Sequence, residues 1–195
     1  MLRSDIINAF IAERNYTTFL EIGTEYGTNL SKINAPFRFS VDPNQRSTAS
    51  FVMTSDDFFE KFDTHYDIIF IDGLHEHNQV WRDINHSLAV LNPGGVVILH
   101  DCLPTSEHMQ EYHTTSQSGY AWTGDVWKAI VKARAELPYE IYTINADMGC
   151  AVIDTTIKKK SKTSKLLRNM ETMTYQQFLD HPEWMNVKEG ILHAE

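Results

Sequence analysis

The feature that most constrains the fold is an apolar strand that runs directly into a turn with two glycines. The stretch Thr18–Thr28 reads TFLEIGTEYGT, so Gly23 and Gly27 follow the strand four positions apart. Glycine has no Cβ, and the backbone can therefore turn sharply there and approach a ligand closely. A helix expected to begin near Thr28 would point its N-terminus at whatever lies over the turn. The pattern predicts a site for a nucleotide-like cofactor.

The spacing of these glycines differs from the dinucleotide fingerprint Gly-x-Gly-x-x-Gly. Glu25 stands where the middle glycine would be, and Gly27 comes one residue late. Without the middle glycine, the backbone cannot approach a pyrophosphate as closely as that motif requires. The sequence therefore favours a nucleoside ligand without a diphosphate.

Apolar runs and helical patterns alternate along the chain, which predicts a doubly wound α/β sheet. Strands are expected over Thr18–Ile22, Phe37–Val41, Phe51–Met53, Asp67–Ile71, Val96–Leu99, Tyr139–Ile144 and Cys150–Ile153. Helices are expected over Ser4–Arg14 with Ser4 as N-cap, from Ser55 onward, over Glu76–Leu91 and over Asp125–Leu137. The short connection 145–149 requires a hairpin, so we expect the last strand to run antiparallel to its neighbour.

Four acidic residues each close one of the apolar strands, and they are Glu21, Asp42, Asp72 and Asp101. Ligands of doubly wound sheets bind outside the carboxyl ends of the strands, where the strand order reverses. One acidic residue after a strand is most often a helix cap or a turn residue. Four of them, with a glycine turn among them, indicate a binding edge instead.

Composition limits the remaining choices of partner and location. The chain has 195 residues, which suits one domain of ordinary size. Its formal net charge of -9 disfavours a nucleic-acid partner, because phosphate binding needs a basic surface. No apolar run approaches the ~20 residues that span a bilayer. Cys102 and Cys150 are the only cysteines, which predicts no disulfide framework and a reducing, cytoplasmic location.

Taken together, these motifs resemble the class I S-adenosylmethionine-dependent methyltransferases. The likeness is greatest to a small bacterial group with an Asp-Gly-Leu-His segment, here Asp72–His75, and a His-Asp-Cys segment, here His100–Cys102. The motifs that carry it are Glu21–Gly27, Asp42, Ser55-Asp56, Phe70–His75 and Leu91–Gly95, within a resemblance that runs from Phe19 to Ile153. It implies a Rossmann-like sheet of seven strands, mostly parallel with an antiparallel last strand, in the order 3-2-1-4-5-7-6.

The resemblance also implies which residues bind S-adenosylmethionine. They are Glu21, Gly23, Thr24, Gly27, Asp42, Ser55, Asp56 and Asp72. The two glycines would let the backbone pass close to the methionyl and ribose parts, and Glu21 would lie near the amino acid end. Asp42 would accept hydrogen bonds from both ribose hydroxyls. Ser55 and Asp56 would contact adenine, and one of the two is also expected to cap the helix that follows.

Methyl transfer from a sulfonium is an in-line displacement, in which the enzyme aligns the acceptor and removes its proton. We expect His75 to be the general base, assisted by Asp72 and Asp101, because its pKa lies near neutrality. The alternative is a surface histidine at a helix start. The expected acceptor is a hydroxyl on a small molecule or a glycan precursor. A nicotinamide oxidoreductase and a catalytically silent cofactor-binding protein remain as alternatives.

Asp72 and Asp101 also raise the hypothesis of a bound cation. Two carboxylates on adjacent strands can hold a Mg²⁺-like ion that orients a diol, as in the related catechol and macrolide-sugar O-methyltransferases. Those relatives place a further acidic or amide ligand after the second aspartate, whereas this chain has Cys102, a poor magnesium ligand. With His75 or His100 as a further donor, the ion would be zinc, manganese or iron.

Two segments outside the cofactor motifs are expected to serve other roles. We assign 1–155 to the methyltransferase domain and 156–195 to a basic linker and a helical tail. Apolar groups of the tail would dock on the domain or on a second subunit of a homodimer. The aromatic-rich stretch 104–124 is too long for a simple connection and is predicted to be a mobile acceptor-binding lid.

Overall fold

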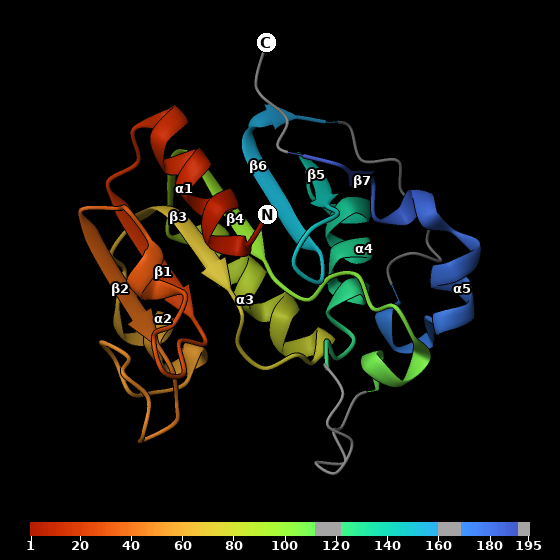
Figure 1. Cartoon of the computed structure of the whole chain (residues 1–195), viewed down its shortest axis with the longest axis horizontal. Coiled ribbons are helices and arrows are strands. Elements are labelled where there is room, and N and C mark those ends of the chain that lie inside the picture. The colour runs from red at the N-terminus through yellow and green to blue at the C-terminus, as the bar shows by residue number, and fades with distance from the viewer. Residues whose placement is uncertain (112–121, 160–168, 191–195) are drawn as a thin grey trace.

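A mixed seven-stranded sheet with the order β2-β1-β3-β4-β6-β5-β7 forms the centre of the molecule (Figure 1). The computed structural model describes residues 1–111, 122–159 and 169–190. The strands are β1 Thr18–Ile22, β2 Phe37–Val41, β3 Tyr66–Ile71, β4 Leu91–Leu99, β5 Tyr139–Ile144, β6 Cys150–Lys158 and β7 Val187–Lys188. The helices are α1 Arg3–Arg14, α2 Ser55–Lys61, α3 His77–Ala89, α4 Val126–Glu136 and α5 Tyr175–Asp180.

Strands β2, β1, β3 and β4 run parallel, and β6 lies antiparallel between β4 and β5. The turn between β5 and β6 contains three successive residues with positive φ, Asp147, Met148 and Gly149. This left-handed backbone lets the chain reverse within a few residues. The predicted Rossmann-like sheet with an antiparallel last strand is therefore confirmed.

Several elements differ from the sequence expectation. The strand expected over Phe51–Met53 is reduced to a single bridge between Val41 and Phe51. The helix expected near Thr28 is a short 3₁₀ turn at Leu30–Lys32, because Pro36 leaves no room for a longer helix before β2. The short strand β7 was not expected, and it pairs parallel with β5 at the far edge of the sheet.

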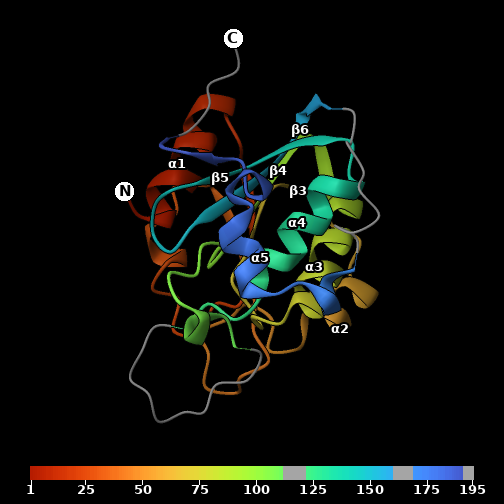
Figure 2. The same ribbon diagram turned by 90° about the vertical axis from the view of Figure 1, so that its right-hand side faces the viewer.

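Helices cover both faces of the sheet, which explains why its strands read as continuous apolar runs. On one face α1 packs Ile6 and Phe10 against Phe70 and its neighbours. On the other face α2, α3 and α4 pack around a second cluster that includes Ile69 and Ile130. Figure 2 shows this layering, with α1 on one side of the strands and α2, α3 and α4 on the other. Among the described helices, none has the length and apolarity needed to cross a membrane.

Residues other than those expected begin helices α1 and α2. The backbone N–H of Leu2 donates to the Asp5 carboxylate at 2.8 Å, while Ser4 lies inside α1 and makes no cap. At α2, the hydroxyl of Thr54 accepts from the backbone N–H of Asp57 at 3.1 Å. The expectation that Ser55 or Asp56 caps this helix is therefore wrong. Their side chains are left to face other partners.

Strand β4 begins at Leu91, well before the expected Val96. Leu91 pairs with Tyr66 and Val96 pairs with Ile68, so the intervening Asn-Pro-Gly-Gly segment bulges out of the ladder. Gly94 has a φ of +82°, which accommodates the bulge. The segment expected to be a turn is therefore an irregular start of the strand.

Residues 169–190 pack on the same body as the rest of the chain. Met170, Met173 and Met185 are buried in the core cluster that α3 and α4 share. Helix α5 begins with a capping box in which Thr174 and Gln177 exchange hydrogen bonds between side chain and backbone. These contacts place the described part of the tail against α4 and β5.

Candidate functional site

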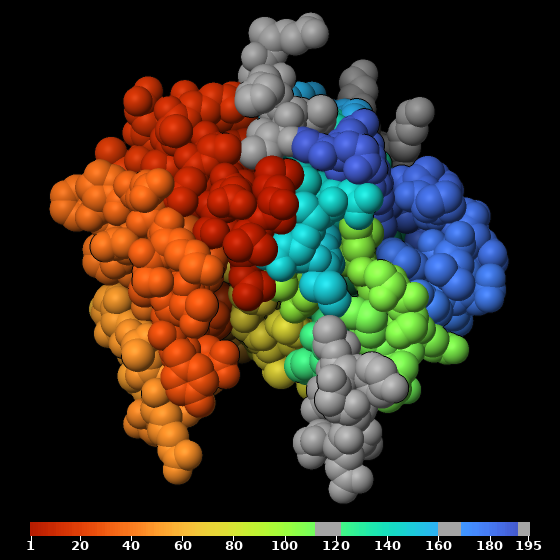
Figure 3. All heavy atoms as spheres, viewed as in Figure 1, coloured from red at the N-terminus to blue at the C-terminus, as the bar shows by residue number. Residues whose placement is uncertain are grey.

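A pocket of about 620 Å³ opens at the carboxyl ends of β1 to β4. Figure 3 shows the surface hollowed between the orange loop after β2 and the green segment after β4, with yellow residues at the bottom. Its lining includes every sequence-predicted site residue except Gly27, namely Glu21, Gly23, Thr24, Asp42, Ser55, Asp56, Asp72, His75 and Asp101. The four strand-end acids do converge, because the carboxyl ends of parallel strands share one edge.

The two turn glycines have different reasons to be glycine. Gly23 has a φ of +86°, and a Cβ there would lie 2.1 Å from the backbone oxygen of Asp72. The residue therefore lets the end of β1 pack directly against the end of β3 at the pocket. Gly27 has a φ of +72° and faces Thr48, whose Oγ1 would lie 2.7 Å from its Cβ. Gly27 shapes the turn but does not line the pocket.

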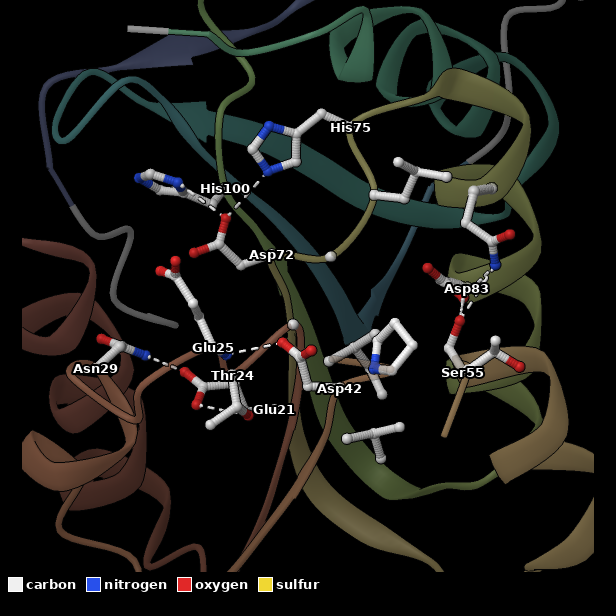
Figure 4. A pocket seen from close by; sticks show the side chains of 18 of the residues that line it. Glu21, Thr24, Glu25, Asn29, Asp42, Ser55, Asp72, His75, Asp83 and His100 are labelled. Atoms are coloured by element: carbon white, nitrogen blue, oxygen red, sulfur yellow. Dashed lines mark hydrogen bonds and ion pairs between the residues drawn. The ribbon is translucent and has the colours of Figure 1, made fainter. Parts of the chain in front are cut away.

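Glu21 is a buried carboxyl at one end of the pocket, with 1% of its surface exposed. Its oxygens accept hydrogen bonds from Asn29 Nδ2 at 2.7 Å and Thr24 Oγ1 at 3.1 Å (Figure 4). Burial raises the pKa of Glu21 to about 7, although both hydrogen bonds favour the ionised form. Asn29 was not singled out from the sequence, because nothing in its spacing distinguishes it from a loop residue.

Asp42 stands at the centre of the pocket, directly after β2. Backbone N–H groups hold both of its oxygens, Glu25 N on Oδ2 at 2.7 Å and Asn44 N on Oδ1 at 2.8 Å. The carboxylate is therefore fixed in position, and each oxygen keeps a lone pair for a further donor. This geometry suits the recognition of two neighbouring hydroxyls.

A cluster of three hydrogen-bonded polar side chains, Ser55, Gln79 and Asp83, forms the wall of the pocket on the side of α2 and α3. Ser55 Oγ donates to Asp83 Oδ1 at 2.7 Å, and Gln79 Nε2 donates to the same oxygen at 3.0 Å. Burial raises the pKa of Asp83 to about 6, against the hydrogen bonds that lower it. Asp56 lies at the rim, where its carboxylate pairs with Arg82 at 3.1 Å. Asp83 and Gln79 were missed because a helix pattern does not show which polar residues face a pocket.

Charged side chains gather where β3 and β4 end. His75 Nε2 lies 3.5 Å from Asp72 Oδ1 and 3.4 Å from Asp101 Oδ2. His100 Nδ1 lies 3.2 Å from each of the same two oxygens. Arg3, the first residue of α1, places Nη1 3.7 Å from Asp72 Oδ2 and 2.7 Å from His100 Nε2. Arg3 comes from outside the motif region, and no sequence signal pointed to it.

These contacts change how the cluster titrates. Against the cost of burial, hydrogen bonds from His100 and His75 hold the pKa of Asp72 well below its usual range. Burial lowers the pKa of His100, but hydrogen bonds to Asp101 and Asp72 outweigh it and raise that pKa to about 10. The same two carboxylates raise the pKa of His75 against its burial. The Asp72 carboxylate therefore stays ionised beside His75 and His100.

The donor atoms of Asp72, His75 and Asp101 all lie within 4.8 Å of one another. Two carboxylates and one imidazole are ligands that manganese, zinc and iron accept. The arrangement therefore fits the cation hypothesis in its donor set. Cys102, in contrast, is buried and hydrogen-bonds backbone oxygens after β4, so it is not among these donors.

Other residues that the sequence brought to attention, His77, Cys102 and Cys150, are buried outside the pocket. His77 is buried outside the pocket, and its backbone N–H and ring pair with Asp125 at 2.8 and 2.6 Å at the start of α3. Cys102 donates its backbone N–H to Gly149 at 3.0 Å, which places it beside the start of β6, where Cys150 is also a free, buried thiol. Of the predicted lid, 112–121 lies outside the described residues. Its end is described, and there the Trp122 ring stacks on His75 with centroids 4.9 Å apart.

Comparison with known proteins bears on the segment that supplies most of this pocket. Residues 20–102 match a family model described as a methyltransferase domain, and this range includes every site residue predicted from the sequence. This stretch is therefore similar to methyltransferase domains. No match was found among curated proteins.

Solved structures share the fold of this chain at low sequence identity. An O-methyltransferase from Bacillus cereus in complex with SAH is 12% identical, with a TM-score of 0.59, over 78% of this chain and 80% of that chain. The O-methyltransferase TomG from Streptomyces achromogenes in complex with SAM is 12% identical, with a TM-score of 0.59, over 81% and 80%. At this identity the likeness shows the fold alone. Together with the family match, it confirms the predicted resemblance to class I methyltransferases.

Proposed function

We propose that this methyltransferase domain transfers the methyl group of S-adenosylmethionine to a hydroxyl of a small-molecule or glycan-precursor acceptor. The observation that carries the proposal is the pocket of about 620 Å³ at the strand ends of the matched segment. Such a volume suits a ligand of this size. The two neighbouring folds that hold SAH and SAM support the same cofactor here, as an analogy at the level of the fold.

The polar groups of the pocket suggest how the cofactor lies. In the proposal, the ribose hydroxyls donate to Asp42, whose oxygens are fixed by two backbone N–H groups. Adenine lies toward Ser55 and Asp56. The methionyl amino group lies toward Glu21, which Thr24 holds in place. The sulfonium then faces Asp72, next to the cluster at the ends of β3 and β4.

The chemistry follows from that placement. The acceptor oxygen attacks the methyl carbon in line with the C–S bond, which breaks as the C–O bond forms and leaves a neutral thioether. The neutral imidazole of His75 takes the hydroxyl proton. Asp72 and Asp101, whose oxygens lie 3.5 and 3.4 Å from its Nε2, stabilise the imidazolium that results. The Trp122 ring on His75 limits the directions from which an acceptor can reach the base.

A cation held by Asp72, Asp101 and His75 is a second candidate for activating the acceptor, favoured by the three converging donors. When bound, such an ion would lower the pKa of a coordinated hydroxyl. The arrangement around His100 favours the base mechanism. His100 Nδ1 already bridges both carboxylates at 3.2 Å, and Arg3 adds a permanent positive charge.

The remaining expectations stay as proposals with their own support. Burial of Met170, Met173 and Met185 supports a tail that docks on its own domain and not on a second subunit. The cytoplasmic location is supported by free Cys102 and Cys150 alone.

The proposal is tested by incubating the full-length chain with S-adenosylmethionine and a panel of catechols, sugars and other hydroxyl compounds. Mass spectrometry should detect a product heavier by one methyl group, together with S-adenosylhomocysteine. His75→Ala should reduce the turnover of any accepted compound by about 10²–10⁴-fold, the usual contribution of a general base. Unchanged turnover in His75→Ala contradicts the base assignment. Reduction of NAD⁺ without methyl transfer contradicts the proposed function and supports the oxidoreductase alternative.

A further inference from the structure

The hydroxyl of Ser55 makes hydrogen bonds that the start of helix α2 does not require. Ser55 follows the cap of α2, so its hydroxyl is not needed by that helix. It is 9% exposed, lines the pocket and contacts two residues of α3, Gln79 and Asp83. Asp83 also lines the pocket, although only 1% of its surface is exposed. Burying a carboxylate is costly unless it is hydrogen-bonded, and the Asp83 carboxylate accepts from the Ser55 hydroxyl and the Gln79 amide.

The hydrogen bonds of Gln79 determine which way its amide points. An Arg guanidinium only donates hydrogen bonds, and Arg82 donates to Gln79 Oε1. The opposite atom of that amide, Nε2, is therefore the donor that faces Ser55 Oγ at 3.1 Å and Asp83 Oδ1 at 3.0 Å. The amide thus occupies one lone pair of the serine hydroxyl.

Asp83 then determines where the hydroxyl hydrogen of Ser55 goes. At pH 8 the Asp83 carboxyl is ionised, since burial raises its pKa only to about 6, and it can only accept. The hydroxyl donates to it at 2.7 Å. A serine hydroxyl has one hydrogen and two lone pairs. The Ser55 hydroxyl directs its hydrogen to Asp83 and accepts from Gln79 with one lone pair (Figure 4). Its second lone pair remains as a single acceptor.

We propose that Gln79 and Asp83 are positioning residues that hold the Ser55 hydroxyl as an acceptor, so that the pocket selects a 6-amino purine over a 6-oxo purine. This inference rests on the proposed function, which places adenine against Ser55. The exocyclic amine of adenine donates to that acceptor. The carbonyl oxygen of hypoxanthine faces the same lone pair and leaves both groups unpaired. The nearby Asp56 carboxylate, which Gln79 Nε2 also contacts at 3.3 Å, presents a second acceptor and acts in the same sense.

The test compares two ligands that differ only at this position, S-adenosylhomocysteine and its deaminated 6-oxo analogue, S-inosylhomocysteine. Both are titrated calorimetrically into the full-length chain at pH 8. We expect the wild-type chain to bind the amino ligand about 10- to 100-fold more tightly, the range expected when a buried polar group is left unpaired. Equal affinity for the two ligands overturns the inference. Failure of S-adenosylhomocysteine to bind contradicts the proposed function itself.

Three variants separate positioning from a structural role. In Asp83→Ala the serine hydroxyl loses its acceptor, which frees the hydroxyl hydrogen to face the pocket. The ratio of the two affinities should therefore fall below about threefold, whereas a purely structural loss would weaken both ligands equally. Ser55→Ala should lower the ratio in the same direction. Asp57→Asn, an exposed carboxylate on the same helix that does not line the pocket, is the matched control and should keep the wild-type ratio. A wild-type ratio in Asp83→Ala or in Ser55→Ala refutes the inference.

Discussion

Replacing Glu21 by Gln should make the ligand-free protein more stable at alkaline pH while weakening cofactor binding. Burial raises the pKa of Glu21 from an ordinary value of 4.5 to about 7, so the fold favours the protonated form. The sign follows from linkage. The stability that this group contributes is fully present below pH 4.5 and is lost as the pH rises through 7. Above that pH, the wild-type fold holds an ionised carboxylate that is 1% exposed.

The size of the effect follows from that shift. A displacement of about 2.5 pKa units corresponds to at most roughly 3 kcal/mol. Thr24 and Asn29 both donate to the Glu21 carboxylate, whereas Gln offers them one acceptor oxygen and one donor amide. We therefore expect the free energy of unfolding to rise by about 1–3 kcal/mol at pH 8. For a chain of this length, each kcal/mol raises the Tm by about 2–4 °C. At pH 5 the carboxyl is mostly protonated, and the gain should shrink below about 1 kcal/mol.

Urea denaturation of the ligand-free chain at pH 5 and pH 8 measures both values. Glu60→Gln, a change of the same kind at an exposed position on α2, is the control and should show no such pH dependence. Binding should change in the opposite direction. Loss of the charged partner of the methionyl amino group should weaken S-adenosylhomocysteine by about tenfold or more. A Glu21→Gln protein that is less stable than wild type at pH 8, or whose gain is the same at both pH values, refutes the reasoning.

Three further predictions concern the catalytic end of the pocket and its turn. Asp72 and Asp101 raise the pKa of His75, so kcat/KM for methyl transfer should rise with pH through an apparent pKa above the ordinary value of about 6.5. A flat profile of kcat/KM from pH 6 to 9 contradicts the role of His75 as base. Under the base mechanism, turnover should persist after dialysis against EDTA, whereas loss of activity with recovery on added Mn²⁺ favours the cation held by Asp72 and Asp101. Gly23→Ala should destabilise the fold by about 2–4 kcal/mol in urea unfolding, since its Cβ would lie 2.1 Å from the Asp72 backbone oxygen; a loss below about 0.5 kcal/mol shows that the turn can relax.

The convergence of the acidic residues was predictable because the topology alone enforces it. Apolar runs such as Asp67–Ile71 identify parallel strands, and parallel strands end at one edge. Glu21, Asp42 and Asp101 follow or close such runs and therefore had to meet. The hairpin before β6 was equally constrained by its short connection. These inferences need only strand order and direction.

The residues that sequence reasoning missed depend on how separate elements pack. Asp83 and Gln79 lie on α3, and only the rotation of that helix against α2 turns them toward Ser55. Arg3 reaches the pocket because α1 docks with its first turn beside the loop that carries Asp147, whose carboxylate accepts from the Arg3 backbone at 2.7 Å. Periodicity identifies the apolar face of a helix but not the polar residue at its border.

The misplaced expectations have the same origin. Gly27 was expected to approach the ligand, but the loop after β2 folds back and brings Thr48 against it. Thr54 caps α2 in place of its neighbours because the helix already begins at Ser55, which leaves the cap position to the residue before it. Loop conformations and helix boundaries of this kind depend on contacts between residues far apart in the sequence, which local patterns do not contain.

Calorimetric titration of the full-length chain with S-adenosylhomocysteine and, separately, with NAD⁺ tests the central claim most directly. The account predicts stoichiometric binding of S-adenosylhomocysteine, no binding of NAD⁺, and an affinity lowered by about tenfold or more in Asp42→Ala, which removes the partner of both ribose hydroxyls. Binding of NAD⁺ without binding of S-adenosylhomocysteine, or an Asp42→Ala protein that binds as tightly as wild type, would contradict it.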